Sequence, residues 1–171
     1  MEFSSDIILK GISWKKTLEG LKPFYKEGNH QKNYILFLIS ASIGIMYDSQ
    51  KNCADNDISE TINVPRTVLH SHNSDLDFLF QTAILTSKTV DFDKKTRMDL
   101  AFNSKSTIEF KKIEFLVKFA NFGIGIILEK ISNNEIETMK NLRELIVDTF
   151  EGNNYNIYGV LDDELDILDF E

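Results

Sequence analysis

Two histidines, His70 and His72, are the first residues whose type and spacing could support chemistry. Residues two apart share one face of a β-strand, so both imidazoles could bind one zinc or manganese ion and activate water for hydrolysis, with Asp75 or Asp77 as further ligands. The alternative is a polar loop leading into a helix, whose first turn favours acidic residues. The loop is favoured, because three metal ligands of the right type are rarely available by accident, and the remaining histidine, His30, lies in a different segment.

A second candidate combines Asp99 with the run Glu109-Phe110-Lys111. Restriction-type nucleases place an Asp and a Glu-x-Lys on adjacent strands, where the carboxylates hold Mg²⁺ and the lysine steadies the attacking water. A hairpin of residues 97–102 and 107–112 would create that geometry. However, Ser106 and Glu109 form a capping-box pattern, which predicts a helix where the nuclease needs a strand. The helix has the longer supporting pattern and is favoured.

Other catalytic signatures are absent from the sequence. There is no Gly-x-Ser-x-Gly, no Walker-type glycine-rich loop and no Gly-x-Gly-x-x-Gly. Cys53 is the only cysteine, which excludes a disulfide within the chain and a cysteine-based zinc site. Residues 94–118 carry seven basic and three acidic residues, a pattern typical of a solvated helix face more often than of a nucleic-acid contact. We therefore expect no cofactor and no catalytic residue.

The C-terminal residues 161–171 alternate acidic and large apolar side chains, with leucines at helical spacing. Such a segment can bury an apolar stripe in a groove of a partner while its carboxylates steer it toward a basic rim. It could equally pack on its own domain or fray. The candidate partner-binding residues are Leu161, Asp163, Leu165, Asp166, Leu168 and Phe170.

The net charge of −8 is concentrated at this end. Residues 151–171 hold seven of the 27 acidic residues and no Lys or Arg, so the first 150 residues carry 20 acids against all 19 bases. A neutral body gives no global footprint for nucleic acid, and we expect any contact with it to be indirect. The N-terminus lacks the pattern of a secretory signal, and the richest apolar stretch, 34–47, is shorter than the roughly 20 residues that cross a bilayer. We expect a cytoplasmic protein without membrane contact.

Apolar periodicity predicts the elements that would position these residues. We expect short helices in the first 30 residues and longer ones over 31–48, from Ser74, over 107–131 and over 135–150, with 49–63 as an exposed loop. Short strands are an option at 90–103 and 155–161. Gly123 and Gly125 either weaken the helix predicted over 107–131, by about 1 kcal/mol each, or allow a close helix contact.

The last of these helices, 135–150, is expected to pack on the domain along an apolar stripe. The side chains predicted to be buried there are Ile136, Met139, Leu142, Leu145, Ile146 and Thr149. The predicted fold is therefore mainly α: a compact helical domain of about five helices over residues 1–160, with room for a small β element, followed by an acidic tail over 161–171.

Two runs resemble those of a known protein family. Arg97 to Asn103 and, more closely, Glu114 to Ile124 with the helix after it resemble small accessory proteins encoded beside DNA phosphorothioation (Dnd-type) defence systems of bacteria. The resemblance covers about residues 66–150 and consists mostly of helix-core residues. It implies a non-enzymatic accessory subunit of an anti-phage or DNA-modification assembly, which acts through protein contacts. The alternative is a metal-dependent nuclease or hydrolase that uses the residues described above.

Overall fold

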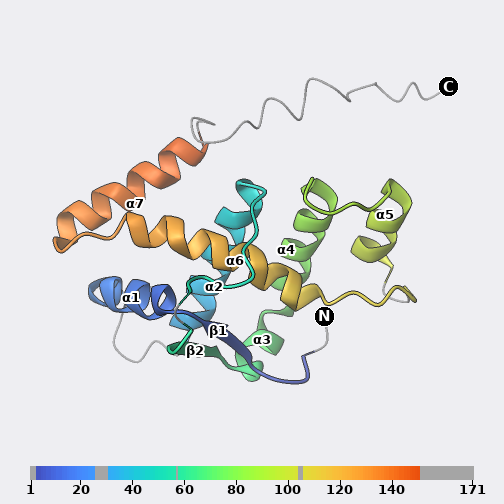
Figure 1. The fold of residues 1–171 in the computed structure, drawn as a ribbon, viewed down its shortest axis with the longest axis horizontal. Coiled ribbons are helices and arrows are strands. Elements are labelled where there is room, and N and C mark those ends of the chain that lie inside the picture. The colour runs from blue at the N-terminus through green and yellow to red at the C-terminus, as the bar shows by residue number, and fades with distance from the viewer. Residues whose placement is uncertain (1–2, 26–30, 57, 104–105, 151–171) are drawn as a thin grey trace.

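The computed structural model describes residues 3–25, 31–56, 58–103 and 106–150 (Figure 1). The described residues form a mainly helical fold with one small antiparallel sheet, which confirms the predicted fold class. In chain order the elements are β1 (Ile7–Lys10), α1 (Ile12–Gly20), the 3-10 turn η1 (Lys22–Phe24), α2 (Lys32–Met46), β2 (Thr61–Val64), α3 (Arg66–Ser71), α4 (Asn73–Thr86), α5 (Lys94–Phe102), α6 (Lys112–Glu129) and α7 (Glu135–Phe150).

The centre of the fold is the crossing of α2 and α6, the two most apolar helices (Figure 1). Glycines let their backbones touch: a Cβ on Gly44 would lie 2.1 Å from the carbonyl oxygen of Phe119, and one on Gly123 would lie 1.9 Å from that of Ser40. By contrast, a Cβ on Gly125 would meet nothing within 4 Å. Of the two alternatives for this glycine pair, close contact therefore holds for Gly123 only.

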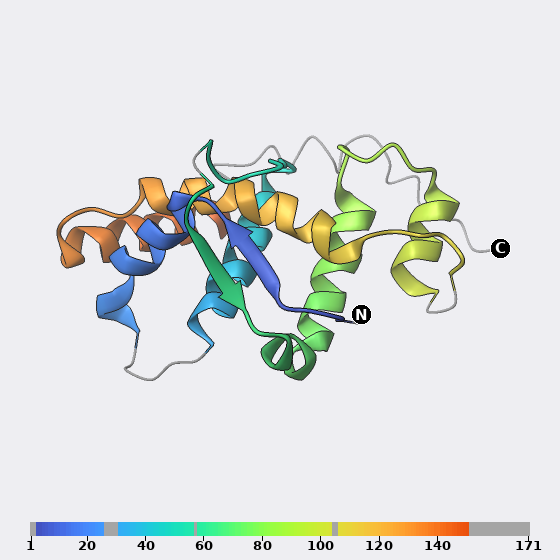
Figure 2. The same ribbon diagram turned by 60° about the horizontal axis from the view of Figure 1, so that its bottom comes forward.

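Strands β1 and β2 pair antiparallel over α1 and α2, with Ile7 opposite Val64 and Lys10 opposite Thr61 (Figure 2). Both alternate buried and exposed side chains, as strands with one covered face do. Ile8 therefore lies on the outer face of the sheet and is 49% exposed. The predictions of helix at residues 7–10 and of loop at residues 61–63 were wrong, because each strand needs a partner more than 50 residues away in the chain.

The N-terminus of α1 is held by a distant carboxylate. Gly11 has φ 126°, a conformation that favours glycine, and its amide donates to the carbonyl of Glu60 at 2.9 Å. The backbone amide and the hydroxyl of Ser13 both donate to Asp55, at 2.7 and 2.6 Å. Asp55 thus satisfies an amide of the first turn that has no partner within the helix, and fastens the 49–56 loop to α1.

Helices α4 and α5 form an antiparallel pair beside the central crossing (Figure 2). The optional strand within residues 90–103 is absent, because Asp93 accepts a hydrogen bond from the amide of Thr96 at 2.7 Å and so begins α5. Likewise α6 begins at Lys112, five residues later than its predicted start, and the predicted capping box did not form. The possible strand at 155–161 lies outside the described residues.

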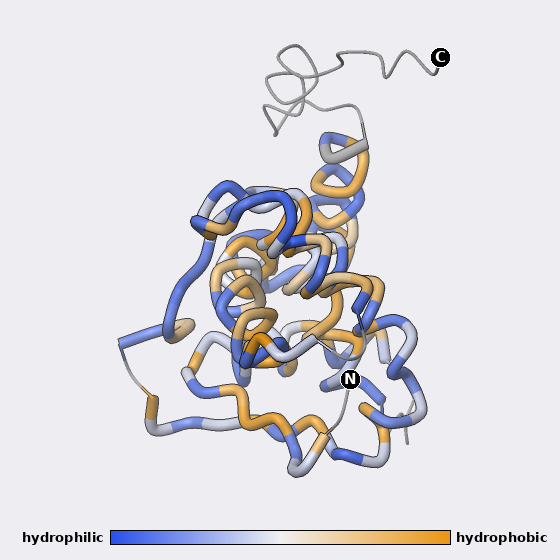
Figure 3. The backbone as a smooth tube through the Cα atoms, turned by 90° about the vertical axis from the view of Figure 1, so that its right-hand side faces the viewer, coloured by the Kyte–Doolittle hydropathy of each residue, from blue (hydrophilic) through white to orange (hydrophobic). Residues whose placement is uncertain are grey.

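Helix α7 follows a turn in which Asn134 accepts hydrogen bonds from the amides of Ile136 and Glu137, at 2.9 and 3.2 Å. Its contacts with the turn and the end of α6 include a hydrogen bond from Asn141 to the carbonyl of Lys130 at 3.2 Å. The C-terminal end of α7 extends away from the body (Figures 1 and 3). No helix in the described part of the chain is long and apolar enough to cross a membrane.

Candidate functional site

His70 lies on α3, where its ring serves the packing of the N-terminal segment. Its Nε2 accepts a hydrogen bond from Nε of Arg66 at 3.1 Å, and its ring meets that of Phe3 edge-on at 5.4 Å between centroids. Accepting this hydrogen bond occupies the lone pair with which Nε2 would bind a metal ion.

His72, at the junction of α3 and α4, has different neighbours. Its ring stacks on Tyr34 of α2 at 4.6 Å, and its Nδ1 lies 3.3 Å from the carboxylate of Asp75, which also accepts from the hydroxyl of Tyr34 at 3.3 Å. Burial and then the Asp75 charge raise the pKa of Tyr34, so the phenol stays a proton donor. This cluster fastens α2 to α4. Nowhere in the described ranges do three His, Cys, Asp or Glu side chains form a group that could hold a metal ion.

The three residues of the nuclease pattern lie on different kinds of structure. Asp99 is in the middle of α5, Glu109 is in an extended segment with no strand partner, and Lys111 is the residue before α6. Asp99 accepts hydrogen bonds from Ser106 and, at 2.6 Å, from Asn103. These two bonds, in that order, lower the pKa of Asp99. The hairpin of 97–102 and 107–112 that the nuclease pattern would need is not formed.

Arg97, from the basic run 94–118, is used within the fold. Its guanidinium donates four hydrogen bonds to backbone carbonyls at the end of α4 and in the loop after it, over distances of 2.5 to 2.9 Å. The carbonyl acceptors belong to Ile84, Ser87, Val90 and Phe92. A positive charge at the C-terminal end of α4 also complements the helix dipole. This arginine closes a loop, and four of its five N–H donors are taken by these carbonyls.

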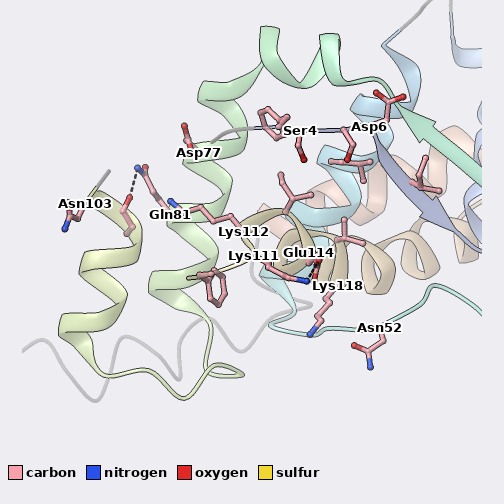
Figure 4. Close-up of a pocket in the computed structure, with 18 of the residues that line it drawn as sticks. Ser4, Asp6, Asn52, Asp77, Gln81, Asn103, Lys111, Lys112, Glu114 and Lys118 are labelled. Atoms are coloured by element: carbon pink, nitrogen blue, oxygen red, sulfur yellow. Dashed lines mark hydrogen bonds and ion pairs between the residues drawn. The ribbon is translucent and has the colours of Figure 1, made fainter. Parts of the chain in front are cut away.

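An open groove of about 1020 Å³ lies between β1, α4, the end of α5 and the start of α6 (Figure 4). Three charged side chains along it, those of Lys111, Lys112 and Glu114, have partners in the fold. Lys111 donates to Glu114 at 2.8 Å, a bond that raises the pKa of this lysine. Lys112 donates to the carbonyl of Leu100 at 3.3 Å and lies 4.7 Å from the ring of Phe80.

The acidic residue Asp6 at the side of the groove is also hydrogen-bonded within the fold. Asp6 accepts hydrogen bonds from the side chain of Asn63 and the backbone amide of Arg66, each at 2.7 Å, and these bonds lower its pKa. It therefore caps α3, much as Asp55 caps α1. The groove lining contains no histidine or cysteine. The bonds of Asp6, Lys111 and Lys112 fasten β1, α3 and α6.

The outer face of α7 is the second surface of interest, because it carries apolar side chains that were predicted to be buried. Ile136 is 82% exposed, and Met139, Ile146 and Val147 are 52%, 56% and 40% exposed. The prediction was correct for Leu145, which is buried, and in part for Leu142, which is half-buried. For Ile136, Met139 and Ile146 it was wrong. Apolar segments recur along the projecting helix in Figure 3.

These exposed residues lie on one side of the helix. At about 100° per residue, positions 136, 139, 143, 146 and 147 share a face, opposite the face of Thr138 and Leu145 that meets the body. Lys140 borders this face and pairs with Glu144 at 3.7 Å. Arg143 is at its centre. We call residues 136, 139, 140, 143, 146 and 147 the α7 stripe: apolar at both ends and basic in the middle.

Sequence reasoning identified the apolar positions of the α7 stripe but assigned them to the core. The signal that could have revealed the exposed face is the presence of apolar residues on both sides of the helix, which one body can cover only on one side. The candidate partner-binding residues of 161–171 lie outside the described residues.

Comparison with known proteins finds no matching family, no similar curated protein and no similar solved structure.

Proposed function

We propose that this protein is a non-enzymatic, partner-binding subunit, and that the α7 stripe is the surface with which it docks. The observation that carries the proposal is the exposure of Ile136, Met139, Ile146 and Val147 on one face of a projecting helix. Contiguous exposed apolar side chains on a surface helix are typical of helix-in-groove recognition, with anchors three, four and seven residues apart.

The energetic case rests on the amount of apolar surface. Fully burying an isoleucine or methionine side chain contributes about 1.5–3 kcal/mol, so four such residues, already partly covered, supply several kcal/mol. Association costs at least about 4 kcal/mol in lost freedom of motion. The stripe alone therefore supports a weak contact, and a stable complex needs an additional surface of the subunit.

The basic centre of the stripe favours an acidic, apolar segment of a protein partner. Arg143 makes no hydrogen bond or ion pair with another described residue, and its guanidinium can bind a carboxylate through two parallel hydrogen bonds. The resemblance to accessory proteins of Dnd-type systems suggests the setting: a bacterial anti-phage or DNA-modification complex, in which this chain contacts protein and meets DNA only through its partners.

The test is co-expression with the proteins encoded next to this chain, followed by affinity measurement on the purified pair. The variant Ile136→Gln/Ile146→Gln removes one apolar side chain from each end of the stripe while keeping a good helix former at each position. We expect it to weaken binding at least tenfold. Phe78→Gln is the matched control, since Phe78 is 70% exposed on α4 and remote in sequence from the stripe; its affinity should not change.

Equal binding of the stripe variant and the unchanged protein would contradict the assignment of the surface. A second measurement addresses the alternative function. If the purified chain cleaved DNA only with added Mg²⁺ or Mn²⁺, and Asp99→Asn abolished that cleavage, the protein would be an enzyme and the proposed role would be refuted.

A further inference from the structure

The α7 stripe leads directly into residues 151–171, whose chemistry is complementary to it. We infer that residues 161–171 of the same chain lie along the α7 stripe and cover it when no partner is bound. The contact is within one molecule and would form without any partner. The inference rests on the proposed docking surface and adds a way to regulate it, because a partner would have to displace residues 161–171 before it could bind the α7 stripe.

The apolar residues of each segment are spaced so that they share one face of a helix. On α7 the apolar ends of the stripe are Ile136 with Met139 and Ile146 with Val147. In the C-terminal segment, apolar residues follow one another at steps of three and four, the period with which one helix packs along another. They are Leu161, Leu165 and Leu168.

The charges of the two segments are opposite. The middle of the stripe holds Arg143, with Lys140 beside it. Lys140 already pairs with Glu144, whereas Arg143 has no partner among the described residues. Residues 161–171 contain six acidic side chains and no basic one. An apolar–basic–apolar face thus has, in the same chain, a segment of complementary composition in which acids alternate with leucines.

The connecting residues are long enough for this contact. Positions 136 to 147 span about 17 Å of helix, at about 1.5 Å per residue. Ten residues, 151–160, join α7 to the C-terminal segment, and ten residues can reach about 33 Å when extended. The chain can therefore return along α7 in the antiparallel direction, which is the arrangement of a helical hairpin.

The same tether favours this segment over a second copy of the chain. A segment joined by a short linker is present at an effective concentration in the millimolar range. A second molecule at micromolar concentration would need an affinity about a thousandfold higher to occupy the stripe equally. Two stripes facing each other would also bring Arg143 of one molecule toward Arg143 of the other.

Disulfide trapping tests the contact in the full-length chain. With Cys53 replaced by serine, Met139→Cys on the stripe is combined with Leu165→Cys in the C-terminal segment. The control combines Leu165→Cys with Met98→Cys, a methionine that is 46% exposed on α5. We expect the stripe pair to form an intramolecular disulfide at least ten times faster than the control pair under mild oxidation at low micromolar protein.

The role of charge has its own variant. Arg143→Glu in the Met139→Cys/Leu165→Cys background should slow trapping several-fold, and Arg143→Lys should slow it less. Equal trapping rates of the stripe pair and the control pair would overturn the inference, as would a product that is a covalent dimer only.

The outcomes separate this inference from the proposed function. Trapping requires no partner, so its failure leaves the docking of a partner on the stripe untouched. Conversely, fast trapping together with unchanged partner affinity of Ile136→Gln/Ile146→Gln would leave the intramolecular contact standing and remove the docking role.

Discussion

Replacing Gly123 by alanine tests the packing at the centre of the fold. The added Cβ would lie 1.9 Å from the carbonyl oxygen of Ser40 and 2.8 Å from its carbonyl carbon. Both atoms are backbone, so no side chain can move aside, and α2 and α6 must separate by more than about 1 Å to restore ordinary contact. Overpacking of this kind costs about 1–3 kcal/mol and occasionally more.

Alanine is also the better helix former, by about 1 kcal/mol, which offsets part of this cost. Because the clash is between two backbones along the longest contact of the fold, we expect the upper part of the range and a net loss of about 2 kcal/mol. For a domain of this size, each kcal/mol corresponds to about 2–4 °C, so the Tm of Gly123→Ala should fall by about 4–8 °C.

Gly125→Ala is the matched control, two residues further along the same helix. A Cβ at Gly125 meets nothing within 4 Å, so only the gain in helix propensity remains. This variant should be more stable by up to about 1 kcal/mol, with a Tm higher by about 2–4 °C. Urea unfolding followed by circular dichroism gives both free energies, with the slope showing whether two-state behaviour is kept.

The difference in stability between Gly123→Ala and Gly125→Ala tests the close contact of α2 and α6. If Gly123→Ala were as stable as Gly125→Ala, then α2 and α6 would cross at a larger distance and the account of the core would be wrong. Gly44→Ala is an independent check, since its Cβ would lie 2.1 Å from the carbonyl oxygen of Phe119. Once one alanine has separated the helices, the second should cost less, so the double variant should lose less than the sum of the single losses.

Two further predictions concern polar side chains. Arg97→Lys should lower the free energy of unfolding by about 1.5–3 kcal/mol, because an ammonium cannot reproduce the planar fork that serves four carbonyls; Lys95→Arg, an exposed exchange on the same helix, should change it little. Hydrogen bonds from Ser106 and Asn103 lower the pKa of Asp99 in the folded protein. The ionised carboxylate therefore stabilises the fold fully above its ordinary pKa of 3.8, and this stabilisation is lost as the pH falls through the lower pKa of the folded state. Acid unfolding of Asp99→Asn should therefore depend less steeply on pH below about 4 than that of the unchanged protein, while parallel curves would contradict the assignment.

Helices were predictable from the sequence where the apolar periodicity of the segment itself determines the helix. Over 31–48 and 135–150 the predicted ranges differ from α2 and α7 by no more than two residues at either end. The strands were not predictable in this way. Ile7 to Lys10 and Thr61 to Val64 are only four residues each, and a strand of that length is stable only through its partner.

The start of α6 shows how a local pattern loses to a distant contact. Ser106 was expected to cap the helix, but its hydroxyl donates to Asp99 on α5. The amide of Ile108 lies 3.3 Å from the same hydroxyl, a turn that continues into extended chain instead of helix. The nuclease geometry needs the carboxylate of Asp99 to face Glu109, whereas here this carboxylate accepts a hydrogen bond from Ser106.

For the candidate surface, the sequence predicted the composition but not the exposure. Periodicity places Ile136, Met139 and Ile146 on apolar positions of a helix, and it carries no information on which side another element lies. That side is set by the turn at Asn134, where Thr138 bonds to Ser132 and directs Leu145 toward the body. The outer positions are left to solvent.

The residues that carry the resemblance to Dnd-associated proteins have structural roles in this fold. Asn121 accepts from the indole of Trp14 at 3.3 Å and donates to the carbonyls of Lys51 and Asn52, at 3.3 and 3.0 Å. Gly123 permits the helix crossing described above. A run of this kind specifies how a loop and a helix pack on α6, and any chain with the same crossing would need it whatever it binds. Evidence for the function must therefore come from residues that the packing does not require, and the exposed side chains of the α7 stripe are such residues.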